Sequence, residues 1–286
     1  MNFKDEFTEL FEKLKDYNSH PTENLSETFL CVVKAAFAKC IEYNYFIQSH
    51  NSVENSFFHT PFLRGICEDL IVLKYLRKYF SSDKDELLQV YMQYLLKTSI
   101  EVQTAYFGQV APDQISPKKE KIREEIVELE DRLKATMQKN GLNKERIFPS
   151  VEHMAIDGKL KQLYDFFYHA TSRMVHFSPN ILLRMGWYHT DKEGKWGPTI
   201  FSSTNFHKYY EQFNKFYAAL LFVEFSKTFK TELNLDASFM SIVKKIKKSF
   251  SEENFYPELV TFEELNIKRP SDFFRVLKKV IREHEK

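Results

Sequence analysis

Residues 29–49 read FLCVVKAAFAKCIEYNYFIQS, and apolar side chains fall on nearly every side of a helix built from this stretch. A helix that is apolar all round belongs in the interior of a protein rather than on its surface. His20-Pro21 interrupts any earlier helix, and Thr22 or Asn24 can cap the new one. The stretch therefore predicts a long central helix against which the rest of the chain packs.

The segments on both sides of this helix also repeat apolar residues at helical spacing. One long segment opens near Thr60-Pro61, where proline suits the first turn of a helix. Near the end of the chain, Thr261 and Glu264 have the spacing of a capping box. Helices are predicted over residues 3–17, 62–80, 86–107, 116–139, 164–179 and 204–230, after Asp236, and at the end of the chain. The pattern predicts an all-α helical bundle.

One segment favours strands instead. The sequences LLRMGWYHT (182–190) and KWGPTIFSS (195–203) flank a four-residue turn, Asp191 to Gly194. We therefore expect one inserted β-hairpin at about residues 184–202, packed against the helices because two strands are not stable alone. With no tandem repeat or low-complexity linker, we predict a single helical domain over residues 1–286, with a core bundle at 20–230 and a C-terminal helical extension at 231–286.

Composition narrows the range of functions. The chain has 41 basic and 40 acidic residues, so any nucleic-acid binding must use a local patch. Only 7 glycines occur, and the motifs of P-loop, dinucleotide and α/β-hydrolase sites are absent. The three cysteines, Cys31, Cys40 and Cys67, form no CxxC pair, which favours reduced, buried thiols and a cytoplasmic protein. No apolar run is long enough to span a membrane, so no membrane partner is expected.

Candidate chemistry gathers in residues 164–179, YDFFYHATSRMVHFSP. Residues three and four apart are neighbours on a helix, which predicts one continuous face. That face would carry Asp165, His169, Ser172, Arg173 and His176. Histidine can act as general acid or base near neutral pH, and arginine can bind a phosphate and stabilise developing negative charge. The alternative is a buried network in which the same groups hydrogen-bond between helices.

A second candidate is the pair Arg64 and Glu68, four residues apart in an otherwise apolar helix. Glu68 could orient a histidine on another helix and Arg64 could bind an anion, or the two could form an ordinary ion pair. Because an unpaired charge in an apolar helix is costly, we expect this pair to join an inter-helix polar network with the first cluster. No HExxH and no Glu-x-x-His pair of di-iron bundles is present, so neither a metal nor a cofactor is predicted.

These motifs resemble a bacterial family of helical proteins that carry a domain of unknown function. The resemblance covers about residues 25 to 230 and rests on Arg64-x-x-x-Glu68 and on Tyr168…Ser172…His176 with its break at Pro179. More distantly, the layout is similar to the HEPN superfamily, helical bundles that often act as metal-independent RNases. This similarity implies that His176 is the catalytic base, that Arg173 binds phosphate, and that two copies pair through their active faces.

The resulting hypothesis is a HEPN-like RNA-processing or toxin-type protein of bacterial defence or stress response. His176, Arg173, His169, Glu68 and Arg64 would be its catalytic residues, and Ser172, Tyr168 and Asp165 would contact the substrate. RNA, a second copy or other subunits of a defence complex would be its partners. Only Met174 and Val175 separate Arg173 from His176, a shorter gap than in HEPN nucleases. The alternative is therefore a non-enzymatic interaction or sensing module, with a metal-dependent hydrolase as a third option.

Overall fold

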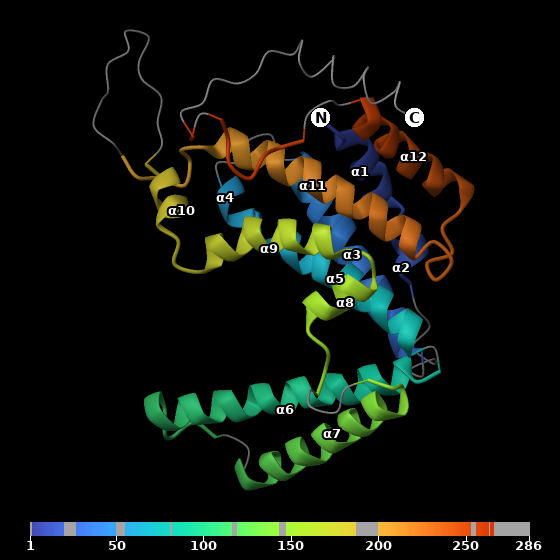
Figure 1. Ribbon diagram of the computed structural model, residues 1–286, viewed down its shortest axis with the longest axis vertical. Coiled ribbons are helices and arrows are strands. Elements are labelled where there is room, and N and C mark those ends of the chain that lie inside the picture. The colour runs from blue at the N-terminus through green and yellow to red at the C-terminus, as the bar shows by residue number, and fades with distance from the viewer. Residues whose placement is uncertain are drawn as a thin grey trace.

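The protein is a bundle of α-helices with a two-helix arm (Figure 1). A computed structural model describes residues 2–19, 27–49, 55–80, 82–115, 119–142, 147–186, 200–252, 256–262 and 264–265. The helices within these ranges are α1 (Lys4–Glu12), α2 (Leu14–Asn18), α3 (Thr28–Ser49), α4 (Ser56–His59), α5 (Pro61–Tyr79), α6 (Lys84–Val110), α7 (Lys119–Lys139), α8 (Val151–Asp157), α9 (Lys161–Val175), α10 (Pro179–Arg184), α11 (His207–Thr228) and α12 (Ala237–Glu252).

Helix α3 is the central helix that the sequence predicts. It packs against α1, α2, α5, α6 and α11. Phe37, Cys40 and Ile41 on this helix are fully buried, and Phe37 lies against Phe222 and Phe225 of α11. Because its apolar side chains point in several directions, α3 can be covered on several sides at once.

One hydrophobic core runs through the body of the molecule. It extends in sequence from Phe3 of the N-terminal segment to Phe250 of α12, whose ring packs against Phe216 of α11. Asp236 caps α12 as expected, accepting a hydrogen bond of 2.7 Å from the backbone N–H of Phe239. The all-α architecture is confirmed, and the division into core and extension stays a prediction.

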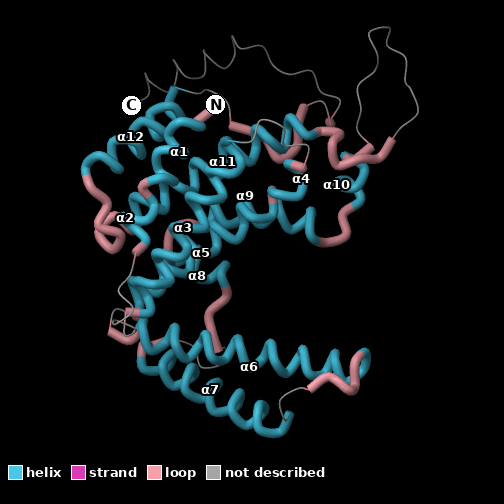
Figure 2. Tube along the Cα trace, turned by 180° about the vertical axis from the view of Figure 1, so that it is seen from behind, coloured by secondary structure: helices cyan, strands magenta, loops and turns pink. Residues whose placement is uncertain are grey.

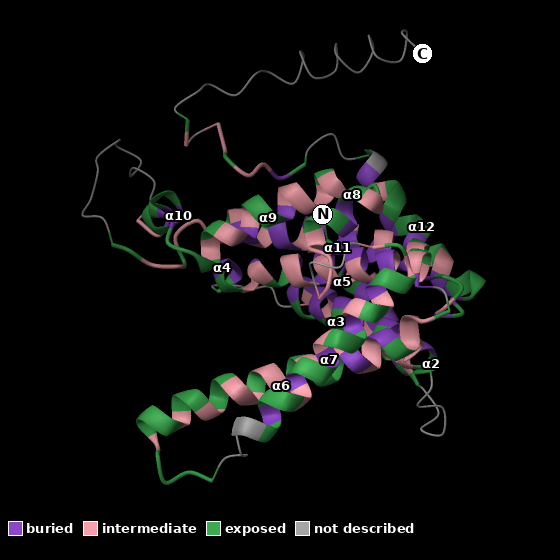
Figure 3. Cartoon of the chain, turned by 60° about the horizontal axis from the view of Figure 1, so that its bottom comes forward, coloured by how far each residue is buried: buried purple, intermediate pink, exposed green. Residues whose placement is uncertain are grey.

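Helices α6 and α7 form an arm that extends away from the body (Figure 2). Of the 27 residues of α6, only Leu87 and Val90, near its start, are buried. Leu129 and Leu133 of α7 join the main core, as the narrow apolar stripe of that segment predicts. Figure 3 shows that much of α6 beyond this point is exposed or only half-buried.

The predicted hairpin is not seen. Residues 187–199 lie outside the described part of the chain, and the described residues contain no strand. Leu182 to Arg184, expected to begin the first strand, are the last turn of α10. The reason is Pro179, which sits in the first turn of α10 and starts a new helix after the break at Ser178. The final predicted helix, after residue 265, also lies outside the described residues.

Two further observations concern the membrane-spanning potential of the helices and the state of the cysteines. None of the described helices is both long and apolar enough to cross a membrane. Cys40 and Cys67 are buried and unpaired, whereas Cys31 is half-buried. Burial raises the pKa of the Cys67 thiol to about 12, which keeps it protonated and unreactive.

Candidate functional site

Helix α9 has an apolar face and a polar face. Phe167 and Thr171 are buried against the core, and the Thr171 hydroxyl donates a hydrogen bond of 2.6 Å to the carbonyl of Phe167. The other side of α9 carries five of the predicted site residues, all exposed or half-buried: Asp165, Tyr168, His169, Ser172 and Arg173. The predicted common face therefore exists for Asp165, His169, Ser172 and Arg173, with Tyr168 beside them, and it lies on the opposite side of α9 from the core.

His176 does not continue this face on a further helical turn. Helix α9 ends at Val175, and His176 has an extended backbone with φ of −109° and ψ of 161°. The helix stops because Ser178 and Pro179 begin α10 directly afterwards. The predicted helix over residues 164–179 is therefore wrong in its last turn, and His176 is an exposed residue at the end of α9.

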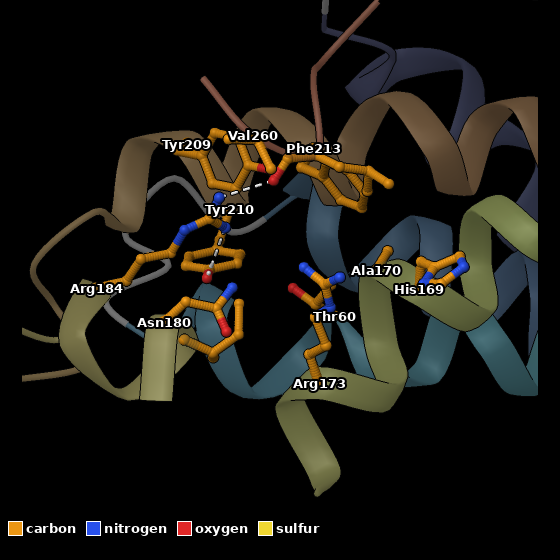
Figure 4. A pocket seen from close by; sticks show the side chains of 12 residues that line it. Thr60, His169, Ala170, Arg173, Asn180, Arg184, Tyr209, Tyr210, Phe213 and Val260 are labelled. Atoms are coloured by element: carbon orange, nitrogen blue, oxygen red, sulfur yellow. Dashed lines mark hydrogen bonds between the residues drawn. The ribbon is translucent and has the colours of Figure 1, made fainter. Parts of the chain in front are cut away.

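A cavity of about 170 Å³ lies between α9, α10 and α11 (Figure 4). His169, Ala170 and Arg173 of α9 form one wall, and α10 and α11 form the opposite side. The remaining lining residues are Thr60, Asn180, Ile181, Arg184, Tyr209, Tyr210, Phe213, Leu259 and Val260. Of the predicted site residues, His169 and Arg173 are thus brought together at one cavity.

Arg173 reaches into this cavity from α9, as Figure 4 shows. Its guanidinium makes no hydrogen bond or ion pair within the described part of the chain. His169 lies one helical turn earlier, and among the described residues its ring has an edge contact with the ring of Tyr168, at 6.2 Å between centroids, and no hydrogen bond or ion pair. A guanidinium without an ion-pair partner among the described residues, in a cavity that an imidazole also lines, is suited to binding an anion such as phosphate.

Arg184 enters the same cavity from α10 but is fully paired. Its Nε and Nη2 donate bidentate hydrogen bonds to Glu264, at 2.5 and 2.7 Å, and Nη2 also donates to the Leu259 carbonyl at 2.7 Å. Nη1 donates to the Tyr210 hydroxyl at 3.2 Å. Burial opposes its charge, but these partners outweigh burial and raise the pKa of Arg184. Arg184 therefore links α10 to α11 and to residues 259 and 264 of the chain. Arg173 is the cation of this cavity that remains available to a ligand.

Glu264 also closes the capping box that the sequence predicts. The backbone N–H of Thr261 donates to Glu264 Oε2 at 2.8 Å, and the backbone N–H of Glu264 donates to Thr261 Oγ1 at 3.3 Å. The hydroxyl of Tyr209 donates to the Glu258 carbonyl at 2.5 Å. These bonds fix the strap formed by residues 256–262 and 264–265, which supplies Leu259 and Val260 to the cavity.

The Arg64–Glu68 pair meets α9 at a different place. Arg64 Nε donates to Glu68 Oε1 at 2.7 Å, and its guanidinium lies 4.8 Å from the ring centre of Tyr168. The pKa of the nearby Tyr164 is raised, mainly by burial and also by the charge of Glu68, and the charge of Arg64 offsets only part of this rise. Among the described residues no hydrogen bond or ion pair joins Arg64 or Glu68 to the first cluster, so the expected polar network is not formed there, and Arg64 reaches α9 through the ring of Tyr168 instead. Glu68 has no histidine partner among the described residues, and neither Arg64 nor Glu68 lines the cavity.

Two further predicted residues have local partners. Asp165 forms an ion pair with Lys161, one turn earlier on α9. The Ser172 carbonyl accepts the backbone N–H of His176 at 2.9 Å and so closes the end of the helix. Neither side chain lines the cavity. Within the described ranges, no three His, Cys, Asp or Glu residues group closely enough to hold a metal ion.

Sequence reasoning missed Arg184, Asn180 and Tyr210. Arg184 lay in a segment that reads as a strand, and Tyr210 in a row of apolar residues on a long helix. The spacing of Thr261 and Glu264 was visible, but a capping box gives no sign that its glutamate also binds an arginine 80 residues away.

A comparison with known protein families matches the part of the chain that contains α9 and α10. The model of a family of unknown function, DUF5677, matches residues 34–195, which is more than half of the chain. The chain belongs to the DUF5677 family. The matched DUF5677 region contains Arg64, Glu68 and all of α9 and α10, and it stops before α11 and the strap that complete the cavity. No match was found among curated proteins or among solved structures.

Proposed function

We propose that this protein binds RNA at the cavity beside α9 and cleaves its phosphodiester backbone without a metal. The observation that carries the proposal is that Arg173 and His169 line one cavity with no neutralising partner among the described residues. A distant relationship to the HEPN superfamily, and with it a role in bacterial defence or stress response in the cytoplasm, forms part of the same proposal.

In the proposed reaction, Arg173 binds a non-bridging phosphate oxygen and stabilises the charge that develops there. His169 takes the proton of the adjacent 2′-hydroxyl, whose oxygen then attacks phosphorus. The bond from phosphorus to the 5′-oxygen breaks, and that oxygen takes a proton from water. The products are a 2′,3′-cyclic phosphate and a free 5′-hydroxyl. His176 is the base in the HEPN comparison, but His169 is the histidine that lines the cavity.

An RNA-cleavage assay in the presence of EDTA tests this assignment. We expect Arg173→Ala and His169→Ala each to lower the cleavage rate by about 10²-fold or more, because general acid–base catalysis contributes about 10²–10⁴-fold. The matched control is His153→Ala, which removes an exposed histidine of α8 outside the cavity and should leave the rate unchanged. Equal rates for all three variants would refute the site.

A His176→Ala variant separates the two histidines. If its loss is large and that of His169→Ala is small, His176 is the base and the role given to His169 is wrong.

A second candidate function is a non-enzymatic interaction module. The observation that favours it is the exposed apolar surface of α6. This function predicts that the protein neither cleaves nor retains RNA, and that binding assays with Arg173→Ala and with the unmodified chain give the same result.

A further inference from the structure

Asn180 lies across the cavity from Arg173. It follows Pro179 in the first turn of α10, and its side chain lines the same cavity as Arg173 and His169. Figure 4 shows the Asn180 amide nitrogen turned towards the middle of this cavity, on the side from which Arg173 enters. Two helices, α9 and α10, therefore each present a hydrogen-bond donor to one cavity.

The break between α9 and α10 fixes the orientation of this amide. The buried Ser178 donates a hydrogen bond of 2.5 Å from its hydroxyl to Asn180 Oδ1. Because the amide oxygen is engaged by Ser178, the NH₂ group is turned away from that partner. Asn180 Nδ2 donates no hydrogen bond within the described ranges of the chain, so its two N–H groups remain available to a ligand.

The charges around this amide favour an anion. None of the described residues that line the cavity carries a carboxylate, and Glu264, the acidic partner of Arg184, is not among them. The lining does include the guanidinium of Arg173 and the imidazole of His169, which can become protonated. The guanidinium supplies the charge that an oxyanion requires, and the Asn180 amide supplies a second directional hydrogen bond without adding charge.

We propose that Asn180 is a further catalytic residue, which binds one non-bridging oxygen of the phosphate while Arg173 binds the other. This role rests on the proposed function, since it concerns the same site and the same reaction. As the 2′-oxygen attacks phosphorus, negative charge increases on these two oxygens, and donors that are already in place stabilise it. Asn180 donates hydrogen bonds and keeps its protons, so the bonds formed and broken in the reaction are unchanged.

Binding of a fluorescein-labelled oligonucleotide that lacks 2′-hydroxyls, followed by fluorescence anisotropy, measures phosphate recognition without cleavage. We expect Asn180→Leu, which has a similar shape but no amide, to weaken binding about tenfold, because a hydrogen bond to a charged group is lost. Asn180→Asp should weaken it further, because its carboxylate can still accept from Ser178 but repels phosphate. Arg173→Ala should weaken binding at least as much as Asn180→Leu, since it removes the charge as well as the hydrogen bonds.

The matched control is Gln162→Glu. It makes the same change from amide to carboxylate at an exposed position of α9 that does not line this cavity, so it should leave binding nearly unchanged at physiological salt. Thermal denaturation separates recognition from folding. An acidic residue in the first turn of a helix is favourable, so Asn180→Asp should be as stable as the unmodified chain while it binds the oligonucleotide less well.

Cleavage of RNA with intact 2′-hydroxyls, measured in EDTA, gives a second reading. Removal of one donor to a developing oxyanion lowers the rate by about 10²–10³-fold, and we expect a loss of that size for Asn180→Leu. Because this exceeds the expected tenfold loss of binding, it would show that the Asn180 contact is stronger in the transition state than in the bound substrate.

The outcomes separate this role from the proposed function. If Arg173→Ala abolishes oligonucleotide binding and RNA cleavage but both Asn180 variants match the unmodified chain, the role of Asn180 is overturned and the proposed site stands. If the Asn180 variants weaken oligonucleotide binding but the unmodified chain cleaves no RNA, the phosphate contact is supported and the proposed cleavage is refuted. A chain that does not bind the oligonucleotide at all would overturn both.

Discussion

Arg184 carries a permanent charge in a position that is only 5 % exposed, and Glu264 supplies its compensating charge. Breaking a buried ion pair by removing one partner is strongly destabilising, because the other charge is left without compensation. Glu264→Gln keeps a side chain that can still close the capping box but removes the negative charge. We expect it to lower the free energy of unfolding by about 2–4 kcal/mol in chemical denaturation.

Two comparisons make this prediction specific. Glu128→Gln, at an exposed position of α7, should change the free energy of unfolding by no more than about 0.5 kcal/mol. Replacing both partners, Arg184→Met with Glu264→Met, should cost less than the sum of the two single replacements, because no buried charge remains. If Glu264→Gln were as stable as the Glu128→Gln control, the ion pair would not hold the strap in place.

At the scale of one element, α9 is asymmetric. Phe167 is 1 % exposed and contacts the rings of Phe166 and Tyr217, whereas Phe177, just beyond the helix, is 86 % exposed. Phe167→Ala should therefore lower the free energy of unfolding by about 3–5 kcal/mol. Phe177→Ala, the same chemical change, should lower it by less than about 0.5 kcal/mol. Comparable losses measured by thermal denaturation would contradict this orientation of α9.

The helices that were predicted correctly are those that a short stretch of sequence indicates by itself. Helix α3 follows from a run of apolar residues, and the start of α5 follows from Pro61 in its first turn. The end of α9 and the existence of α10 were not predicted, because the apolar residues after Pro179 fit a strand as well as a helix. Only packing against the rest of the chain decides between the two, and Ile181 does so by lying against Phe57 and Tyr210.

The candidate site was predicted to the extent that it lies on one helix. His169 and Arg173 are four residues apart, so their common face can be read from the sequence. The opposite wall comes from α10, α11 and the strap, which are distant in sequence and carry no motif. The contact between Arg64 and Tyr168 likewise depends on how α5 crosses α9, which spacing within either helix does not determine.

At the scale of the whole molecule, the described part of the body is held by one large aromatic-rich core and a small second cluster of Phe57, Ile181 and Tyr210, and the arm extends from this body (Figure 1). Several tyrosines form part of this core or its edge. Burial raises the pKa of Tyr75 to about 12, and it also raises the pKa of Tyr43, Tyr209 and Tyr217. In an unfolded chain these phenols ionise near pH 10. The stability of the body is therefore linked to alkaline pH.

The direction of that linkage follows from proton binding. Above about pH 10 the unfolded chain releases phenolic protons that the folded chain retains, so each rise in pH favours unfolding. We expect the free energy of unfolding contributed by these groups to be intact below pH 10 and to fall as the pH rises towards about 12. Chemical denaturation across this range measures the loss, and tyrosinate absorbance should show folded protein with several of its 15 tyrosines still protonated at pH 11. Ionisation of all tyrosines near pH 10, with the helical signal unchanged, would mean that these phenols are open to solvent and that the core is less tightly packed around them than the structure indicates.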